Sequence, residues 1–163
     1  MESPLIRDAT REDIRGMLEA QHSAVHEIAA MSYSPEICQD WSPPVTAQRI
    51  DLFDRELFSA CSIIVAEVQG RIVGYAAVLC DEAELRDLYV SARFGGRGIG
   101  GKLLRAVERV AQKCGCRVLA LNATVTAEHF YIKHGYREIE RRNVTLSSGR
   151  QISCIRMRKE LIQ

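Results

Sequence analysis

Hydrophobic positions change their period along this chain of 163 residues, and each change predicts a different element. In the first third, apolar residues recur three or four positions apart, which predicts one or two helices over residues 11–31 and another over residues 46–59. Serine and proline interrupt the helical pattern at residues 32–35 and again at residues 42–44. A short apolar segment over residues 5–7 reads as an opening strand.

From residue 62 onward the pattern is mostly that of strands. Apolar runs on either side of Gln69-Gly70 predict an antiparallel hairpin, with strands over residues 62–68 and 72–79. The later elements that we expect are a strand over 84–90, a helix of about four turns that ends near Gly115, a strand over 118–122, a helix over 127–134, and strands over 137–146 and 151–157. Hairpins joined by one strand–helix–strand crossover predict an α/β (α+β) fold: a mixed, mainly antiparallel central sheet of about six or seven strands, with helices on both faces.

Length and composition narrow the class of protein. A chain of this length fits one domain, residues 1–163, and a 47% hydrophobic, 26% charged composition is typical of a globular protein. A formal net charge of +1 without a basic block argues against a partner that is nucleic acid or an anionic membrane. No stretch reaches the ~20 apolar residues that span a bilayer, and the N-terminus lacks the apolar region of a signal peptide. We therefore expect a cytoplasmic protein.

The cysteines and histidines do not suggest a metal centre. All six cysteines are expected to be free thiols, mostly buried, in a reducing compartment. His22 and His26 stand four residues apart on a predicted helix, but no third ligand follows them, so no metal is expected.

The glycine-rich run over residues 95–101 indicates a phosphate-binding loop. Its glycines would let backbone N–H groups converge on an anion at the start of the next helix. Three readings overlap here: a P-loop, a dinucleotide fingerprint and a loop for the pyrophosphate of an acyl-CoA. Leu103 stands after Lys102 where a P-loop needs Ser or Thr, and the strand that ends at Asn122 lacks the acid of a dinucleotide site. The acyl-CoA reading is favoured, and a glycine-rich turn without a ligand stays open.

Two segments in order resemble motifs of the GNAT acetyltransferases. The first comprises Leu88-Tyr89-Val90 and the glycine-rich segment 96–104, and the second is the A-x-x-F-Y-x-x-x-G-Y segment over residues 127–136. Residues 73–76 resemble the family's strand that enters the site, and the resemblance covers about residues 4–159. The chain departs from the family's usual residues at three positions, which are Ala92, Gly95 and Thr124.

The resemblance implies roles for particular residues. Acetyl-CoA is expected as the cosubstrate, bound by Leu88, Tyr89, Val90, Gly96, Arg97, Gly98, Ile99, Gly100, Gly101 and Tyr131. Tyr131 would also be the general acid that protonates the leaving sulfur. Glu84 matches the base of one branch of the family, and strand alternation would place it on the opposite face from Asp87. Tyr33 and Trp41 are expected to line the site of the acceptor amine.

The function that these residues imply is an N-acetyltransferase acting on a primary amine of a small molecule or peptide. Direct transfer within a ternary complex is expected, because no cysteine stands beside a convincing base. A homodimer through the C-terminal strands is possible by analogy with relatives. The three departures favour an alternative, a non-catalytic sensor or regulatory domain that binds acyl-CoA. A nucleotide-dependent enzyme would rest on the overlapping glycine motifs alone.

Overall fold

Seven strands form one sheet in the order β1-β2-β3-β4-β5-β7-β6 in the computed structural model, which describes residues 2–162. The strands are β1 (Leu5–Asp8), β2 (Ser62–Val68), β3 (Arg71–Leu79), β4 (Glu84–Val90), β5 (Val118–Thr124), β6 (Arg137–Thr145) and β7 (Gln151–Glu160). Every neighbouring pair is antiparallel except β4 and β5, which are parallel. The expected mixed, mainly antiparallel sheet is confirmed.

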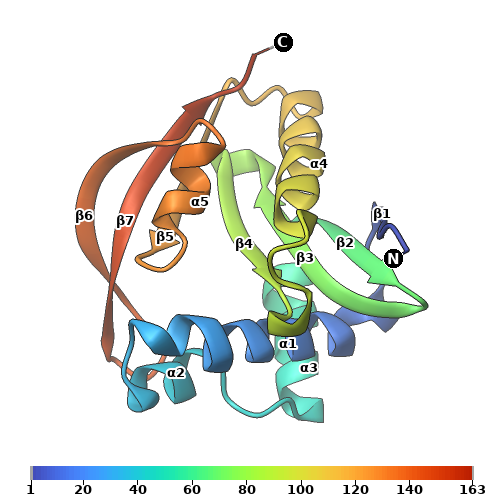
Figure 1. The fold of residues 1–163 in the computed structure, drawn as a ribbon, viewed down its shortest axis with the longest axis vertical. Helices are drawn as coiled ribbons and strands as arrows, with labels where there is room; N and C mark the ends of the chain where they lie inside the picture. The colour runs from blue at the N-terminus through green and yellow to red at the C-terminus, as the bar shows by residue number, and fades with distance from the viewer. Residues whose placement is uncertain (1, 163) are drawn as a thin grey trace.

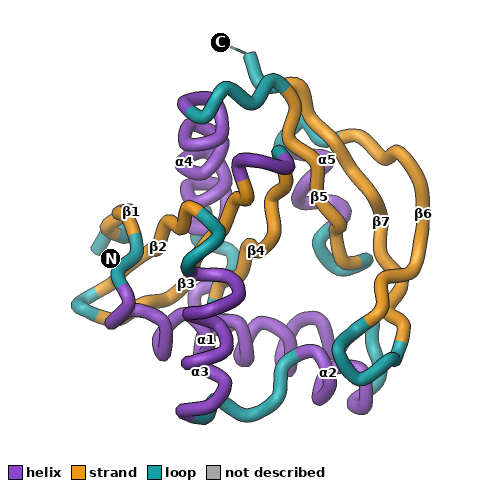
Figure 2. The backbone as a smooth tube through the Cα atoms, turned by 180° about the vertical axis from the view of Figure 1, so that it is seen from behind, coloured by secondary structure: helices purple, strands orange, loops and turns teal. Residues whose placement is uncertain are grey.

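Helices cover both faces of this sheet, as expected. They are α1 (Ile14–Ser23), α2 (Pro35–Trp41), α3 (Ala47–Phe53), α4 (Ile99–Lys113) and α5 (Glu128–Lys133), and π-helical turns extend α1 over Ala24–Ile28 and α3 over Asp54–Phe58. Figure 1 shows α4 and α5 in front of the sheet, whereas Figure 2, seen from behind, brings α1 and α3 to the front.

The core has one part on each face of the sheet. On one face, α4 buries Leu103, Leu104 and Val107, each fully inaccessible to solvent, against the strands. On the other face, Met17 of α1 packs against Tyr75 and its neighbours. The apolar stripe of α4 therefore fixes the position of the helix whose N-terminus carries the glycine-rich loop.

Helix α2 was missed by the sequence pattern, which gave only the breaks on either side of it. Ser34 caps the helix by accepting a hydrogen bond from the N–H of Ile37 at 3.2 Å, and Pro35 occupies the first helical position. These are ordinary helix-start residues, so the break before α2 was in fact its N-terminal signal.

A β-bulge changes the faces of β4. Ala77 pairs with Asp87 while Val78 pairs with Leu85, so Arg86 is an extra residue in β4. Leu85 and Leu88 consequently pack into the same core beside α4. The simple alternation expected from sequence is wrong here, and Glu84 lies on the same face as Asp87 rather than opposite it.

Strands β4 and β5 separate soon after they meet. Their register contains two pairs, Glu84 with Ala120 and Leu85 with Leu121. Strand β5 pairs with β7 along its whole length, from Val118 to Thr124, and so follows β7 away from β4. The edge of β4 beyond Leu85 is thereby left open toward β5.

The expectation of six free thiols is wrong for two cysteines. Cys80, just after β3, forms a disulfide with Cys114 at the end of α4, across a Cα–Cα distance of 6.1 Å. The two are 34 residues apart, and the packing of α4 across β3 brings them together. Four cysteines are free: Cys38, Cys61, Cys116 and Cys154.

We predict that Leu104→Ala lowers the free energy of unfolding by about 2–5 kcal/mol, because it leaves a cavity between α4 and the sheet. Leu52→Ala is a matched control, since Leu52 is on α3 with 44% of its surface exposed; its loss should be about 1 kcal/mol or less. Urea denaturation of both variants measures the difference. Equal losses would contradict the core position of α4.

Candidate active site

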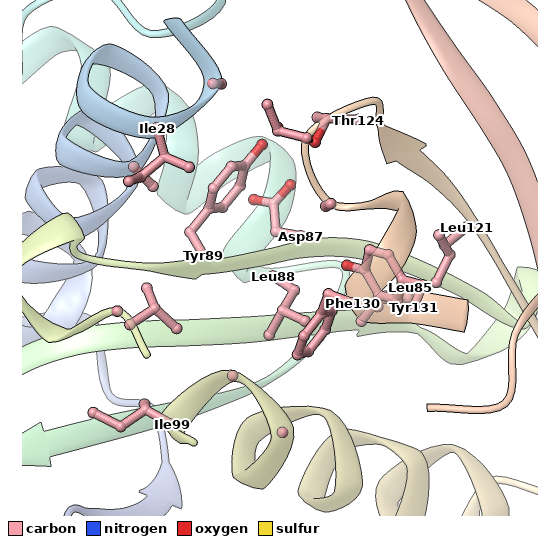
Figure 3. Close-up of a pocket in the computed structure, with 18 of the residues that line it drawn as sticks. Ile28, Leu85, Asp87, Leu88, Tyr89, Ile99, Leu121, Thr124, Phe130 and Tyr131 are labelled. Carbon is pink, nitrogen blue, oxygen red and sulfur yellow. The ribbon is translucent and has the colours of Figure 1, made fainter. Parts of the chain in front are cut away.

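A cavity of about 840 Å³ occupies the opening between β4 and β5. It is lined by β4, the glycine-rich loop and the start of α4, the end of β5, α5, and the segment from Ala24 to Ala29 together with Trp41. Figure 3 shows side chains from these elements pointing into one space. Of the residues expected to bind the cofactor, the lining includes Leu88, Tyr89, Val90, Gly96, Gly98, Ile99, Gly100, Gly101 and Tyr131.

The loop before α4 takes a shape that favours glycine. Gly96 and Gly98 have φ angles of +73° and +78°, a region that costs other residues roughly 1–2 kcal/mol. An added Cβ at either position would meet no atom within 4 Å, so space for a ligand is open beside the backbone. The reason for glycine at these two positions is therefore backbone conformation.

The N-terminus of α4 opens into the cavity. The N–H groups of Ile99, Gly100 and Gly101 precede the first intrahelical hydrogen bonds of this 15-residue helix, so they are free to bind an anion. A Cβ on Gly100 would lie 3.3 Å from the ring of Phe130, which means that α5 packs closely over the helix start. Arg105 joins these donors in the lining with its positive charge.

Arg97, which was expected to bind the cofactor, is outside the lining of the cavity. Its guanidinium lies over the ring of Phe94, 5.0 Å from the centroid. Its role at the loop stays a prediction.

The open edge of β4 offers backbone groups to a ligand. Beyond Leu85 no strand within residues 2–162 pairs with this edge on the β5 side, and Leu88 and Val90 line the cavity there. An unpaired strand edge can hydrogen-bond an extended chain that carries amides.

Tyr131 projects from α5 toward the opening and is 7% exposed. Among residues 2–162 its hydroxyl has no hydrogen-bond partner, whereas its ring packs edge-on against Phe130 and Tyr136. Burial raises the pKa of this phenol well above its usual value, and the nearby charge of Asp87 raises it further. The hydroxyl of Tyr131 is therefore neutral at physiological pH.

The carboxylate of Glu84 forms an ion pair outside the cavity. Both of its carboxylate oxygens accept hydrogen bonds from the guanidinium of Arg156, each at 2.7 Å, and Glu84 is not part of the cavity lining. Arg156 is 72 residues away in the chain, so sequence alone gave no sign of the pair. The base role of Glu84 stays a prediction, and this ion pair argues against it.

Tyr33 and Trp41 occupy different environments. The hydroxyl of Tyr33 donates to the carbonyl of Ser153 at 2.7 Å and accepts from the N–H of Val125 at 2.9 Å, so Tyr33 joins the helical segment to β7 and the loop after β5. Trp41 does line the cavity, and its indole N–H donates to the hydroxyl of Tyr89 at 3.1 Å.

Asp87 is the residue that sequence reasoning passed over. It is the one carboxylate in the cavity lining as far as the structure is described, and its Oδ2 accepts a hydrogen bond from the hydroxyl of Tyr75 at 2.8 Å. Burial raises the pKa of this carboxyl above its usual value, although the bond from Tyr75 opposes the shift. Asp87 keeps the face opposite Leu88 that simple alternation gives it, whereas the bulge at Arg86 changes the faces of Leu85 and Glu84, and no sequence signal marks that bulge.

No group of three or more potential metal-ligating side chains occurs among residues 2–162. None of the helices described is long and apolar enough to cross a membrane.

A helix start open to an anion, beside a strand edge open to an amide arm, is typical of acyltransferases that use coenzyme A. The chain belongs to the GNAT acetyltransferase family, because a model of the acetyltransferase (GNAT) domain matches residues 29–161.

Similarity to individual proteins supports the assignment to this family. An uncharacterised N-acetyltransferase of Methanocaldococcus jannaschii is 29% identical over 147 residues, a match that covers 83% of this chain and 61% of that protein. This chain thus spans less than two thirds of the length of that relative. A GCN5-related N-acetyltransferase from Rhodopseudomonas palustris has a similar structure, with a TM-score of 0.88, 28% identity and coverage of 99% of this chain and 98% of that chain. The yncA protein of Salmonella typhimurium, solved with its cofactor acetyl-CoA, shares the fold at a TM-score of 0.71 and 20% identity, over 99% of this chain and 96% of that chain.

We predict that Gly98→Ala weakens the binding of acetyl-CoA about 10-fold, because the strain of a left-handed alanine would displace the loop. Gly149→Ala is the matched control: Gly149 has a φ of +90° in the turn between β6 and β7, with open space around it, and it is outside the cavity lining. Calorimetric titration should give the control wild-type affinity. Equal weakening in both variants would mean that the loop does not hold the cosubstrate.

Proposed function

We propose that this protein transfers the acetyl group of acetyl-CoA to a primary amine of a small molecule or peptide, by direct transfer within a ternary complex. The observation that carries the proposal is the coincidence, in one cavity, of the free N–H groups of α4, the open edge of β4 and the hydroxyl of Tyr131. Each of these suits a different part of the same reaction.

The residues present fit the cosubstrate. The loop around Gly96 and Gly98 and the start of α4 would hold the pyrophosphate, and Arg105 adds a cation there. The edge of β4 from Leu88 to Val90 would bind the pantetheine arm through backbone groups. Acetyl-CoA, when bound, supplies an acyl group activated as a thioester.

Tyr131 is the proposed general acid. Its neutral hydroxyl, free of other hydrogen bonds within the described chain, can donate a proton to the leaving sulfur. None of the residues that line the cavity is a cysteine, which supports direct transfer rather than an acyl-enzyme on sulfur.

Three further proposals concern the domain organisation, the cellular location and the oligomeric state. We propose that residues 1–163 act as one domain, that the protein works in the cytoplasm, and that pairing through the C-terminal strands, in which β6 is an edge strand, could form a homodimer.

A screen of primary amines with acetyl-CoA tests the function, with free thiol release as the readout. The proposal predicts turnover with at least one class of amine, together with thermal stabilisation by acetyl-CoA of about 2.7 kcal/mol at ~100 times its Kd. Stabilisation without turnover across the screen would favour the alternative, a sensor that binds acyl-CoA. No stabilisation by acetyl-CoA would reject both.

We predict that Tyr131→Phe lowers kcat by about 10²-fold while the affinity for acetyl-CoA changes little, because it removes the proton donor and keeps the ring. Tyr136→Phe is the control, since Tyr136 is also buried beside α5 but donates to Glu108 at 2.9 Å and does not line the cavity. Steady-state kinetics of both variants compares them. An unchanged kcat in Tyr131→Phe would leave Tyr131 with a packing role.

A further inference from the structure

The half of the cavity that faces α1 and α2 differs in chemistry from the half at the glycine-rich loop. In Figure 3, Asp87 and Tyr89 point from β4 toward the same side as Thr124 and Ile28, while Leu88 and Phe130 lie on the other side of the strand. This half, which we call the acceptor side, contains the carboxylate of Asp87. In the described chain no positively charged side chain forms a hydrogen bond with that carboxylate.

Asp87 is held in a defined orientation. Tyr75, 1% exposed, donates to Oδ2 at 2.8 Å, and its ring is fixed edge-on against Phe53 at a centroid distance of 6.0 Å. No hydrogen bond to Oδ1 occurs among residues 2–162, so this oxygen is available to a ligand in the cavity.

The cations nearest to Asp87 are engaged by other groups. Arg49 of α3 donates to Gln21 and Ser42 and to the carbonyl of Pro43. Arg86 is in the cavity lining, but its side chain is exposed and its guanidinium lies 3.7 Å from Glu82. The titratable and charged groups that face Asp87 from its surroundings are Arg49 on α3, Cys61 before β2, Tyr75 on β3, Arg86 and Tyr89 on β4, and Tyr131 on α5. A partly buried carboxylate without a bonded counter-charge is unfavourable, so a cationic ligand would be stabilised here.

Aromatic rings border the same space. Tyr89 and Trp41 both line the cavity with ring centroids 6.2 Å apart, and the hydrogen bond between their polar atoms fixes their relative orientation. Aromatic faces attract ammonium groups, and the attraction is larger where water is excluded. Beyond the rings, Ala24, Val25 and Ile28 give an uncharged wall.

We propose that the acceptor side is an ammonium subsite in which Asp87, bordered by Tyr89 and Trp41, binds a primary amine with a compact apolar body and then accepts its proton. The inference rests on the proposed function and adds its missing base. The ammonium N–H bond breaks, the proton moves to Oδ1 of Asp87 and later to water, and the nitrogen keeps the electron pair with which it attacks the acetyl carbon. As the C–N bond forms, the C–S bond breaks and the leaving sulfur takes the proton of Tyr131. The second nitrogen proton then returns to the oxygen of Tyr131.

Binding of 2-phenylethylamine, a cation at neutral pH, and of neutral 2-phenylethanol tests the subsite without turnover. Both are titrated by NMR into the protein saturated with CoA, which carries no acyl group. Wild type should bind the amine at least about 10-fold more tightly than the alcohol. Asp87→Asn should reduce this preference to about 2-fold or less while the affinity for CoA stays unchanged, which also shows that the variant is folded.

Two further variants test whether the charge at position 87 is responsible for the preference for the amine. Asp87→Glu keeps the charge and should keep part of the preference for the amine. Asp81→Asn removes an exposed carboxylate of the turn between β3 and β4, outside the lining, and should behave as wild type. If Asp87→Asn retains the preference, or if Glu84→Gln loses it instead, the proposal is wrong.

The pH dependence gives an independent readout. Because a carboxylate binds a cation only when ionised, the amine affinity of wild type should fall as pH falls through the raised pKa of Asp87, and this fall should be absent in Asp87→Asn. An unchanged pH profile in the variant would overturn the assignment. Failure of wild type to bind CoA would instead reject the proposed function, so the two failures are distinguishable.

Discussion

The separation of β4 from β5 is the constraint on which the rest of the site depends. The two strands share two register pairs and then diverge, because β5 is paired with β7 from end to end. A strand cannot follow two partners that move apart. The divergence opens the edge of β4, gives α5 a place beside the start of α4, and leaves the cavity between them.

The opening separates two electrostatic environments. On one side are the free N–H groups of α4 and the cation of Arg105, which favour a polyanion. On the other side are the carboxylate of Asp87 and the rings of Tyr89 and Trp41, which favour a cation. An anionic cosubstrate and a cationic acceptor would each be disfavoured in the wrong half, so on the proposed function this charge distribution would orient the two substrates toward Tyr131.

Sequence alone was sufficient for most elements whose signal was local, helix α2 being the exception. The strands, the hairpin and the loop around Gly98 follow from periodicity and glycine spacing within a few residues of one another. Features made by distant residues could not be derived in this way. The bond from Arg156 to Glu84 joins positions 72 apart, the disulfide of Cys80 joins positions 34 apart, and the hydroxyl of Tyr33 reaches Ser153 across the fold. A local pattern cannot contain these partners, because tertiary packing alone decides them.

The bulge at Arg86 determines which side chains of β4 face the core beside α4. If β4 paired with β3 without it while Leu88 and Tyr89 kept their faces, Leu85 would leave the core beside α4 and Arg86 would point into it. An unpaired charge among Leu103 and its apolar neighbours would be strongly unfavourable. The inserted residue lets Leu85 and Leu88 both fill that core while Asp87 stays on the opposite face, next to Tyr75. Without the bulge, β4 could keep Asp87 on this face only by losing Leu85 from the core beside α4, so the irregularity lets the strand serve the core and the acceptor side together.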